Sequence, residues 1–450
     1  MTSVSLAQVA WELAIALNLD LPITRLILQN KTIHVLNLGM GVESTAIAVR
    51  WILESHIRPF QDFDQLIIQI AQTGNEMQET QQLIETYLFP LFRRHQIRCI
   101  QVAKRGSAKA EGYEILEDSY QPTTCFIEGS YKLFDHLAEA GTVPRLGRPH
   151  ACAQRWKGEV LDALLQDKIL MIVWLWILLK ILTFQRYPQM LYWEVIAPCF
   201  FGPYLGYNYQ EQSRIRKVDE YRCRGTRFLF PLNDWQWTRD DCVEYLYWVF
   251  QVHWQKSACQ ACPFLQKRLA TERYRRDPEA GGAACFSEAI ALSINPEMHL
   301  FSFGTAYRLL QEDENAIALA HYDRLLEQTG WALYKVDRLY VQAPSGRKDS
   351  KRRVNRLVVG TLAELQEQLV AIAQSQNLGL SIDLDQRFWR VYEFTKSKTL
   401  PTFESFWVIA PAKVKPKVQY AEKFSDRWEA MTGNPDPFRP ETASRQLQLF

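Results

Sequence analysis

Residues 31 to about 110 alternate between two kinds of apolar segment, and this alternation constrains the fold more than any other feature of the sequence. Strand-like runs at 33–38, 65–71 and 97–103 ("IHVLNL", "QLIIQIA" and "IRCIQVA") alternate with helical runs over 45–53 and 80–95. Such repeats pair their strands in parallel and place the crossover helices on the faces of the sheet. We therefore expect an α/β fold with a doubly wound parallel sheet, whose ligands bind at the carboxyl ends of the strands.

The flanking sequence suggests two further regions. Residues 1–30 read as an N-terminal helical extension, 31–290 as the α/β domain and 291–450 as a smaller C-terminal accessory region. After about residue 330 the pattern changes, and "APSGRKDSKRRVNR" (343–356) separates two apolar segments. At Thr238 a hydroxyl followed by two acids predicts a helix start.

Charge and cysteine usage narrow the class of protein. The chain has 52 Lys and Arg against 50 Asp and Glu, a net charge of +2, so net charge does not argue for a polyanionic partner. The nine cysteines are odd in number and scattered, and "MTSVSLAQVAWELAIALNLD" (1–20) is amphipathic rather than an apolar leader. We expect a cytoplasmic protein whose thiols serve metal binding or chemistry rather than disulfides.

The segment 169–184, "ILMIVWLWILLKILTF", is apolar apart from one lysine and one threonine. As a helix it spans only about 24 Å, short of the roughly 30 Å of a bilayer's hydrocarbon layer. A buried strand or core helix is favoured over a membrane span.

A glycine pair follows the first strand, in "HVLNLGMGVESTAIAVRWI" (34–52). Glycines let backbone N–H groups approach a phosphate, and the positive end of the following helix attracts it. The pattern lacks the Gly-Lys-Ser/Thr of a Walker loop and the third glycine of a dinucleotide fingerprint. A plain tight turn is the alternative. The candidate phosphate-binding residues are Gly39, Met40, Gly41, Glu43, Ser44 and Thr45.

Two further segments follow strand ends. In "AQTGNEMQET" (71–80), Thr73 and Gly74 form a turn before Glu76, although ordinary helix capping would explain the acids. In "GYNYQEQSRIRK" (206–217), Gly206 precedes Glu211 and Arg214, a pair that elsewhere is often a surface ion pair.

Two segments contain candidate thiols. "RPHACAQRWKGEVLDALL" (148–165) sets Arg148, Cys152, Arg155 and Lys157 at a helix start, where the cations favour a Cys152 thiolate and a bound phosphate or sulfate. A solvated basic helix start is the alternative. "SACQACPF" (257–264) is a Cys-x2-Cys knuckle typical of zinc or iron–sulfur sites, or a packed pair of core thiols. The candidate ligands are Cys259 and Cys262, with Cys152, Cys223, Cys242 or Cys285 completing the site.

Taken in order, these segments resemble the phosphoadenosine phosphosulfate reductase-like branch of the adenine nucleotide alpha hydrolases, the enzymes with a pyrophosphatase loop. That family has a Ser-Gly-Gly-x-Asp-Ser loop, a Thr-Gly-x-Glu turn, an Arg/Cys/Lys helix start, Gly-x4-Glu-x2-Arg, Pro-Leu-x-x-Trp and often Cys-x2-Cys-Pro. The corresponding segments here are "GMGVES", "TGNE", "RPHACAQRWK", "GYNYQEQSR", "PLNDW" and "CQACPF". The resemblance covers residues 31 to about 290.

The departures from the family bear on catalysis more than on phosphate binding. Gly39 and Met40 replace the loop's first Ser and Gly, and Glu43 replaces its Asp. Gln72 stands where an Asp commonly precedes Thr-Gly. The true reductases use a cysteine near the C-terminus, and no cysteine follows Cys285.

The resemblance implies an enzyme that binds ATP or a related adenine nucleotide with Mg²⁺ and activates an acceptor by adenylation, releasing pyrophosphate. Arg155, Lys157 and Arg214 would neutralise the transition state. The acceptor could then receive sulfur, with a nucleic acid or a sulfur carrier as partner and a 4Fe–4S cluster or Zn²⁺ on the thiols. The resemblance places Cys152 by the same pocket, which makes it the preferred third ligand, with Cys285 next.

Two alternatives use the same residues differently. The loop substitutions favour a non-catalytic module that senses a nucleotide. The basic runs "GRKDSKRRVNR" (346–356) and "KRLATERYRR" (267–276) favour a nucleic-acid binder with a degenerate loop, or are simply solvated.

Overall fold

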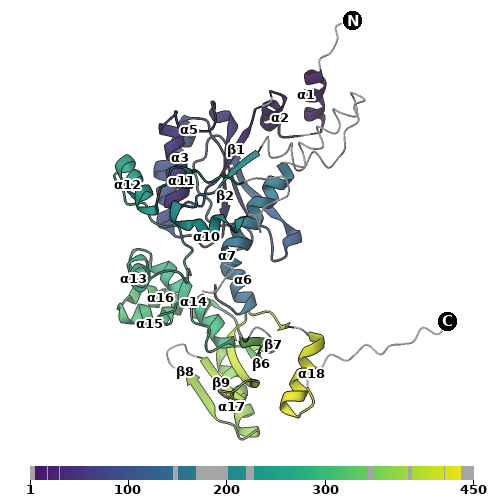
Figure 1. Ribbon diagram of the computed structural model, residues 1–450. Helices are drawn as coiled ribbons and strands as arrows, with labels where there is room; N and C mark the ends of the chain where they lie inside the picture. The colour runs from purple at the N-terminus through teal and green to yellow at the C-terminus, as the bar shows by residue number, and fades with distance from the viewer. Residues whose placement is uncertain are drawn as a thin grey trace, which may run out of the picture. The chain divides into compact units, whose positions relative to one another are not determined.

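The computed structural model describes residues 6–17, 19–29, 31–144, 151–168, 201–218, 228–342, 346, 348–383, 388–419 and 421–436. The chain forms two compact units (Figure 1). Unit 1 comprises 1–136 and 147–262, and unit 2 comprises 137–146 and 263–450. The apolar segment 169–184, Arg148 and Cys223 lie outside the described residues.

Unit 1 begins with two helices and continues as an alternation of strands and helices. Its strands are β1 (Ile33–Asn37), β2 (Leu66–Gln72), β3 (Arg98–Lys104), β4 (Tyr113–Ser119) and β5 (Phe201–Tyr204). Its longer helices are α1 (Leu6–Ala16), α2 (Leu21–Leu28), α3 (Val42–Leu53), α4 (Gln78–Leu83), α5 (Phe89–Arg94), α6 (Leu133–Ala140, which continues into unit 2) and α12 (Arg239–Phe250). Short helical pieces are η1 (Phe63–Gln65), η2 (Ile84–Leu88), η3 (Lys109–Glu111), α7 (Ala151–Ala153), η4 (Gln154–Gly158), η6 (Tyr209–Glu211), α10 (Gln212–Ile215) and α11 (Pro231–Asp234).

The sheet of unit 1 has the order β4-β3-β2-β1-β5. The pairs β1–β2, β2–β3 and β1–β5 are parallel, which confirms the expected α/β class. The expectation of a wholly parallel sheet is wrong at one edge, where β4 pairs antiparallel with β3. Only residues 105–112 join these two strands, and a parallel crossover needs a dozen or more residues.

Helices cover both faces of this sheet. On one face, α3, α5 and α12 bury Trp51, Phe92 and Leu246 against the strands. On the other, α2 and the helix over 159–168 pack Leu26 and Leu164 against Val35 and its neighbours. The sheet is therefore a central layer between two layers of helices. Because β2 and β3 follow on one side of β1 and β5 on the other, the strand order reverses at β1, where ligands of open α/β sheets bind.

Unit 2 joins a helical layer to a second sheet. Its helices are α13 (Lys267–Arg276), α14 (Pro278–Ile294), α15 (Ala306–Glu312), α16 (Ala316–Gln328), α17 (Leu362–Ser375) and α18 (Ala421–Thr432). Its strands are β6 (Trp331–Gln342), β7 (Lys348–Gly360), β8 (Leu380–Asp383), β9 (Phe388–Phe394), β10 (Thr402–Pro411) and β11 (Lys417–Val418). The sheet has the order β11-β7-β6-β10-β9-β8, and every pair in it is antiparallel.

The division between the units falls between Cys262 and Pro263, upstream of the expected boundary at 290. The reason lies in α14, whose Ile290 and Ile294 pack into the core beside Val336 and Phe406 of the second sheet. This helix therefore belongs with the C-terminal sheet in unit 2.

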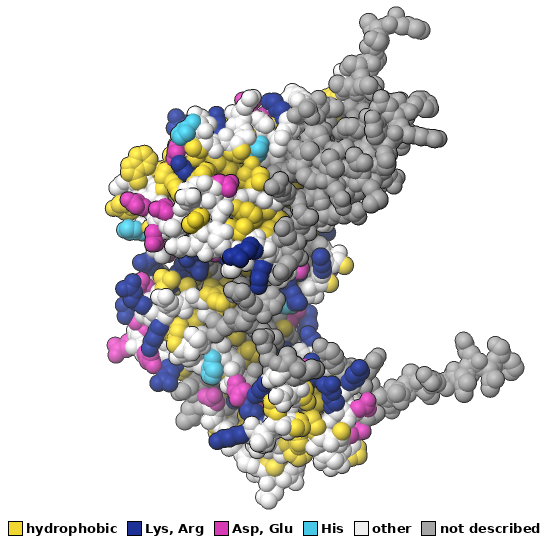
Figure 2. All heavy atoms as spheres, viewed as in Figure 1, with side chains coloured by type: hydrophobic (Ala, Val, Ile, Leu, Met, Phe, Trp, Pro, Cys, Tyr) yellow, Lys and Arg dark blue, Asp and Glu magenta, His cyan; other side chains and the backbone are white. Residues whose placement is uncertain are grey.

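The two basic runs lie in regular elements of unit 2. "KRLATERYRR" forms α13, and on the face drawn in Figure 2 Lys and Arg side chains (dark blue) lie among acidic ones (magenta). Lys267 pairs with Glu312, and Arg275 pairs with Asp313. Most of "GRKDSKRRVNR" lies in β7, where Arg353 is 2% exposed. Much of the basic charge therefore already has partners within unit 2.

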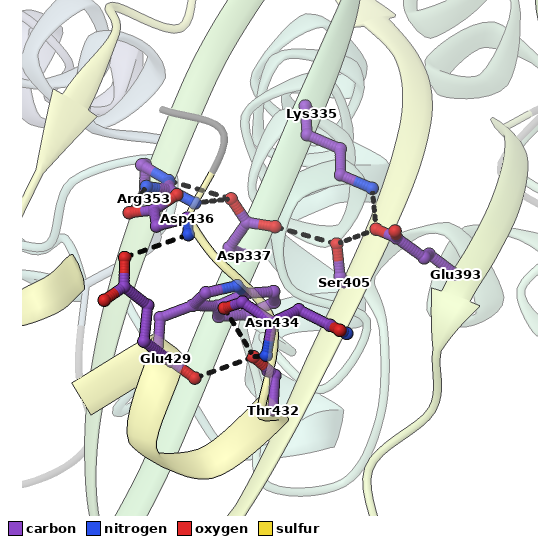
Figure 3. A network of polar contacts seen from close by, with 10 residues as sticks. Lys335, Asp337, Arg353, Glu393, Ser405, Glu429, Thr432, Asn434 and Asp436 are labelled. Carbon is purple, nitrogen blue, oxygen red and sulfur yellow. Dashed lines mark hydrogen bonds and ion pairs between the residues drawn. The ribbon is translucent and has the colours of Figure 1, made fainter. Parts of the chain in front are cut away.

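A connected network of charged and polar side chains, which is buried except at Glu393, crosses the second sheet (Figure 3). Lys335 Nζ lies 2.6 Å from Glu393 Oε2, and the Ser405 hydroxyl lies 3.1 Å from that oxygen and 2.7 Å from Asp337 Oδ1. Arg353 donates to Asp337 at 2.8 Å and also to Asp436, beyond the end of α18. This polar network therefore fixes the segment that follows α18 to the middle of the sheet.

Within the part of the chain that the structure describes, no helix is long and apolar enough to cross a membrane.

Candidate functional site

The start of α3 lies directly beyond the carboxyl end of β1. Gly41 is the N-cap residue in an extended conformation, and no described side chain caps the helix. The first-turn N–H groups of Val42, Glu43 and Ser44 therefore lack an intrahelical partner and a side-chain cap. The Ser44 hydroxyl accepts from Gly39 N at 3.0 Å, which closes the loop around these amides. This is the arrangement of backbone donors that binds anions at helix N-termini.

Met40 adopts a backbone conformation that favours glycine, with φ of 61°. Its side chain is 1% exposed, and its sulfur lies 3.6 Å from Cys125 Sγ. The resemblance places a family glycine at this position. A non-glycine residue therefore holds this left-handed conformation, and its bulky side chain is buried in the core.

The segment after β5 approaches the same helix start. A Cβ added to Gly206 would lie 2.9 Å from Ser44 N, so only glycine fits without a shift. Glu43 is 9% exposed, and its carboxylate accepts from Arg239 Nε at 2.6 Å and from Asn208 Nδ2 at 3.4 Å. Thr45 is fully buried in the first turn of α3. Two sequence segments about 160 residues apart therefore meet at one place.

The Thr73–Glu76 turn follows the neighbouring strand β2. Gly74 has φ of 82°, a conformation that favours glycine. Glu76 is fully buried and accepts from Thr73 Oγ1 at 3.1 Å. It also pairs with Lys157 Nζ of η4 at 2.9 Å. Burial alone would lower the pKa of Lys157, but the Glu76 carboxylate outweighs it and the pKa is raised. Lys157 is therefore a cation held at the end of β2.

Gln72 lies at the expected strand end but points inward. It is fully buried and its amide donates to Gln101 Oε1 at 3.3 Å, with the sulfur atoms of Met40 and Cys125 also nearby. The other proposed cations are more exposed. Arg155 is exposed on η4, and Arg214 pairs with Glu211 while its guanidinium lies 4.2 Å from the ring centroid of Tyr207.

Three of the predicted thiols share one neighbourhood. Burial, followed by the charges of Cys262, Glu76 and Cys152, raises the pKa of Cys259 well above its usual value. The backbone of Cys259 bridges to Glu76, and Gln260 N donates to Asn75 O at 2.8 Å. The knuckle is therefore attached to the turn that follows β2.

In this structure, burial opposes the expected thiolate at Cys152. Burial raises the pKa of Cys152, and the opposing charge of Lys157 is too weak to reverse it. A Cys152 thiol is thus favoured over the thiolate because desolvation penalises the charged form.

The remaining thiols lie elsewhere. Cys285 is 1% exposed on α14 in unit 2, and Cys242 is a fully buried residue of α12 in the core of unit 1. Among the described residues, no group of three or more His, Cys, Asp or Glu side chains is arranged to hold a metal ion. Metal binding at the knuckle stays a prediction.

Residues 254–260 contact both the loop after β1 and the turn after β2, which the sequence did not indicate. Trp254 Nε1 donates to Met40 O at 3.3 Å, and a Cβ on Gly41 would lie 3.0 Å from Ser257 Oγ. We call 254–260 the strap. It contacts the loop after β1 and, through Cys259, the turn after β2. Cys259 within the strap and Cys262 and Pro263 just beyond it form the motif noted in the sequence, but nothing in the pattern indicates a contact with Gly41.

The structure thus brings together at one end of the first sheet the segments that the sequence singled out: Gly39–Thr45, Thr73–Glu76, Cys152–Lys157, Gly206–Arg214 and Cys259–Cys262. Comparisons with protein-family models, with curated proteins and with solved structures found no match to the chain.

Proposed function

We propose that unit 1 binds the phosphates of ATP or a related adenine nucleotide at the start of α3. One observation carries the proposal: an uncapped helix N-terminus lies at the carboxyl end of β1, where the strand order reverses. Its amides and the positive end of the helix favour an anion. Glycines at 41 and 206 bring neighbouring backbone close to this turn.

The reaction that fits this site best is adenylation of an acceptor. The acceptor's oxygen attacks the α-phosphorus of ATP, the bond from that phosphorus to the bridging oxygen breaks, and pyrophosphate leaves with the electron pair. The loop amides and Lys157 would stabilise the charge that develops on the phosphate oxygens. Arg155 and Arg214 would act at the more exposed edge.

Mg²⁺ fits the residues present. Glu76 Oε2 is buried without a hydrogen-bond partner among the described atoms, and a carboxylate oxygen is the ligand that Mg²⁺ prefers. When bound with the nucleotide, the ion would neutralise phosphate charge. Lys157 holds the other oxygen of Glu76 and so fixes the orientation of the carboxylate.

Substitution of Gly41 by valine tests the phosphate site. A branched side chain at the N-cap would block the approach of phosphate to the first-turn amides, so we expect affinity for ATP to fall at least tenfold, about 1.4 kcal/mol. Because valine would also press on Ser257, the variant is made together with Ser257→Gly, and ATP affinity is measured by calorimetry.

Two controls accompany this measurement. Ser257→Gly alone should bind ATP as the wild type does. Gly379→Val lies where an added Cβ meets nothing within 4 Å and should leave binding unchanged. Equal ATP affinity in the folded Gly41→Val/Ser257→Gly protein and in Ser257→Gly would refute the phosphate site.

A non-catalytic nucleotide sensor is the second candidate, and one observation favours it. Two of the three proposed catalytic cations already pair with carboxylates, Lys157 with Glu76 and Arg214 with Glu211. Release of pyrophosphate from ATP by the purified protein would support the enzyme. Binding of ATP without any release, across a panel of acceptors, would support the sensor.

For the thiols we propose an iron–sulfur cluster or zinc on Cys152, Cys259 and Cys262. Anaerobically purified protein is expected to contain iron with sulfide, or zinc, and Cys259→Ala and Cys262→Ala should each abolish the metal. Each should also lower the melting temperature, since metal-binding free energy is partly folding free energy. Cys99→Ala, in the fully buried strand β3, should retain the metal. Full metal content in a Cys259→Ala/Cys262→Ala protein would rule out this site.

A further inference from the structure

The chain passes between the two units at three places: after His136, after Leu146 and after Cys262. Each passage leads to or from the same four residues, the Thr73–Glu76 turn beyond β2. This convergence is independent of any ligand, because it rests on hydrogen bonds within each unit and on the continuity of the chain.

The first passage is helix α6, which begins on the turn. Leu133 N donates to Thr73 O at 2.9 Å, and Phe134 N donates to Asn75 Oδ1 at 2.8 Å. The Asn75 side chain therefore supplies an acceptor to the first turn of α6, as an N-cap residue does. A Cβ on Gly74 would lie 2.9 Å from the side chain of Lys132, so the turn and the helix start are in close contact.

The other end of α6 belongs to unit 2. Ala138 packs in the core with Ile294 and Val414, and the Arg352 guanidinium donates to the carbonyl oxygens of Ala140 and Gly141. Lys415 N donates to Glu139 O at 2.9 Å. One short helix is therefore held at its start by the turn and at its end by the second sheet.

The other passages attach to the same turn. After Leu146 the described part of the chain resumes at residue 151, and Lys157 of η4 pairs with Glu76 at 2.9 Å. Before Pro263, Gln260 N donates to Asn75 O at 2.8 Å and Cys259 bridges to Glu76. Asn75 thus holds one connection with its side chain and another with its backbone.

We propose that the Thr73–Glu76 turn couples the stability of the two units. Opening of the turn releases the start of α6, and the helix transmits the loss to the packing of Ala138 and the bonds of Arg352 in unit 2. Helix formation is cooperative, so a helix of eight residues does not keep its end ordered when its first turn frays. Events at the carboxyl end of β2 therefore reach the second sheet.

Hydrogen exchange of the full-length protein, followed by mass spectrometry, tests the coupling. Asn75→Ala removes the acceptor at the start of α6 but keeps the backbone. We expect amides of β6 in unit 2 to exchange about fivefold faster, the effect of losing one helix cap. Asn75→Asp keeps a side-chain oxygen at this position and should restore wild-type exchange in β6.

Thr238→Ala is the matched control. Thr238 caps α12 in unit 1, and none of the three passages between the units begins within that helix. Its loss should speed exchange in unit 1 and leave β6 unchanged. Faster exchange of β6 in Thr238→Ala as well would show that the whole chain opens together and that the turn is not special. Unchanged β6 exchange in Asn75→Ala would overturn the proposal directly.

A second variant, Arg352→Ala, tests the same coupling from unit 2 if Asn75→Ala fails to fold. Arg352→Ala removes the hold on the other end of α6, and coupling works in both directions. Exchange of β2 amides in unit 1 is expected to rise in this variant. If β2 exchange is unaffected while unit 2 loosens, the two units are independent and the proposal fails.

Discussion

Replacing Arg353 with alanine is expected to destabilise unit 2 by about 3–5 kcal/mol, the cost of leaving a buried charge uncompensated. Arg353 is 2% exposed, and its guanidinium is shared by Asp337 and Asp436, which are also buried. Without it the two carboxylates would lie close together in a medium that solvates neither. Burial already raises the pKa of Asp337 with the arginine in place. Urea unfolding followed by hydrogen exchange in β6 and β7 measures the loss.

Two further variants distinguish the loss of a buried charge from the general effect of removing an arginine. Arg268→Ala removes a side chain that is 90% exposed on α13, and its cost should stay within about 0.5 kcal/mol. Arg353→Met combined with Asp337→Asn and Asp436→Asn removes the charges together and should recover much of the stability, because a neutralised triad leaves no unpaired ion. Similar losses in Arg353→Ala and Arg268→Ala would contradict the proposed role of the buried charges.

The first sheet could be predicted from the sequence because each of its central strands is a short apolar run bounded by turn residues. The runs at 33–38, 65–71 and 97–103 correspond to β1, β2 and β3, and Thr238 is the N-cap of α12 as expected. The carboxyl ends of parallel strands share one edge, so the segments following β1 and β2 were bound to lie near each other. The local signal and the global fold agree here.

Other features depend on tertiary contacts that no local pattern encodes. The basic run at 346–356 was expected to bind nucleic acid or to be solvated, yet most of it lies in β7, where Arg353 and Arg352 have partners far away in the sequence. The cations around Cys152 suggest a thiolate, but burial controls its pKa. Arg239 and Trp254, which contact the loop after β1, each stand more than 190 residues from it. Charge counts along the sequence do not report burial.

Acidification is expected to weaken unit 1 through His34. This residue of β1 is 7% exposed, and its Nδ1 lies 2.8 Å from the Tyr204 hydroxyl. Burial lowers the pKa of His34 from 6.5 to about 4. Between these two values the unfolded chain binds a proton that the folded chain does not, so stability is complete above pH 6.5 and is lost as the pH falls toward 4. Linkage gives a loss of about 2 kcal/mol by pH 5 and about 3 kcal/mol by pH 4.

His34→Asn isolates this contribution, because asparagine can still hydrogen-bond to Tyr204 but does not titrate. The stability of unit 1 is measured from urea unfolding with exchange of β1 amides at pH 7.5 and pH 5, and the wild type should lose about 2 kcal/mol more than the variant.

Glu288 of unit 2 provides an internal contrast, since burial raises its pKa to about 7. Its carboxyl binds a proton more readily in the folded state, so its contribution is present below pH 4.5 and is lost as the pH rises through 7, the opposite sign. Glu288→Gln should therefore flatten the pH dependence of unit 2 without changing that of unit 1. An equal pH dependence of unit 1 in the wild type and in His34→Asn would show that His34 is protonated in the folded protein as readily as in the unfolded chain.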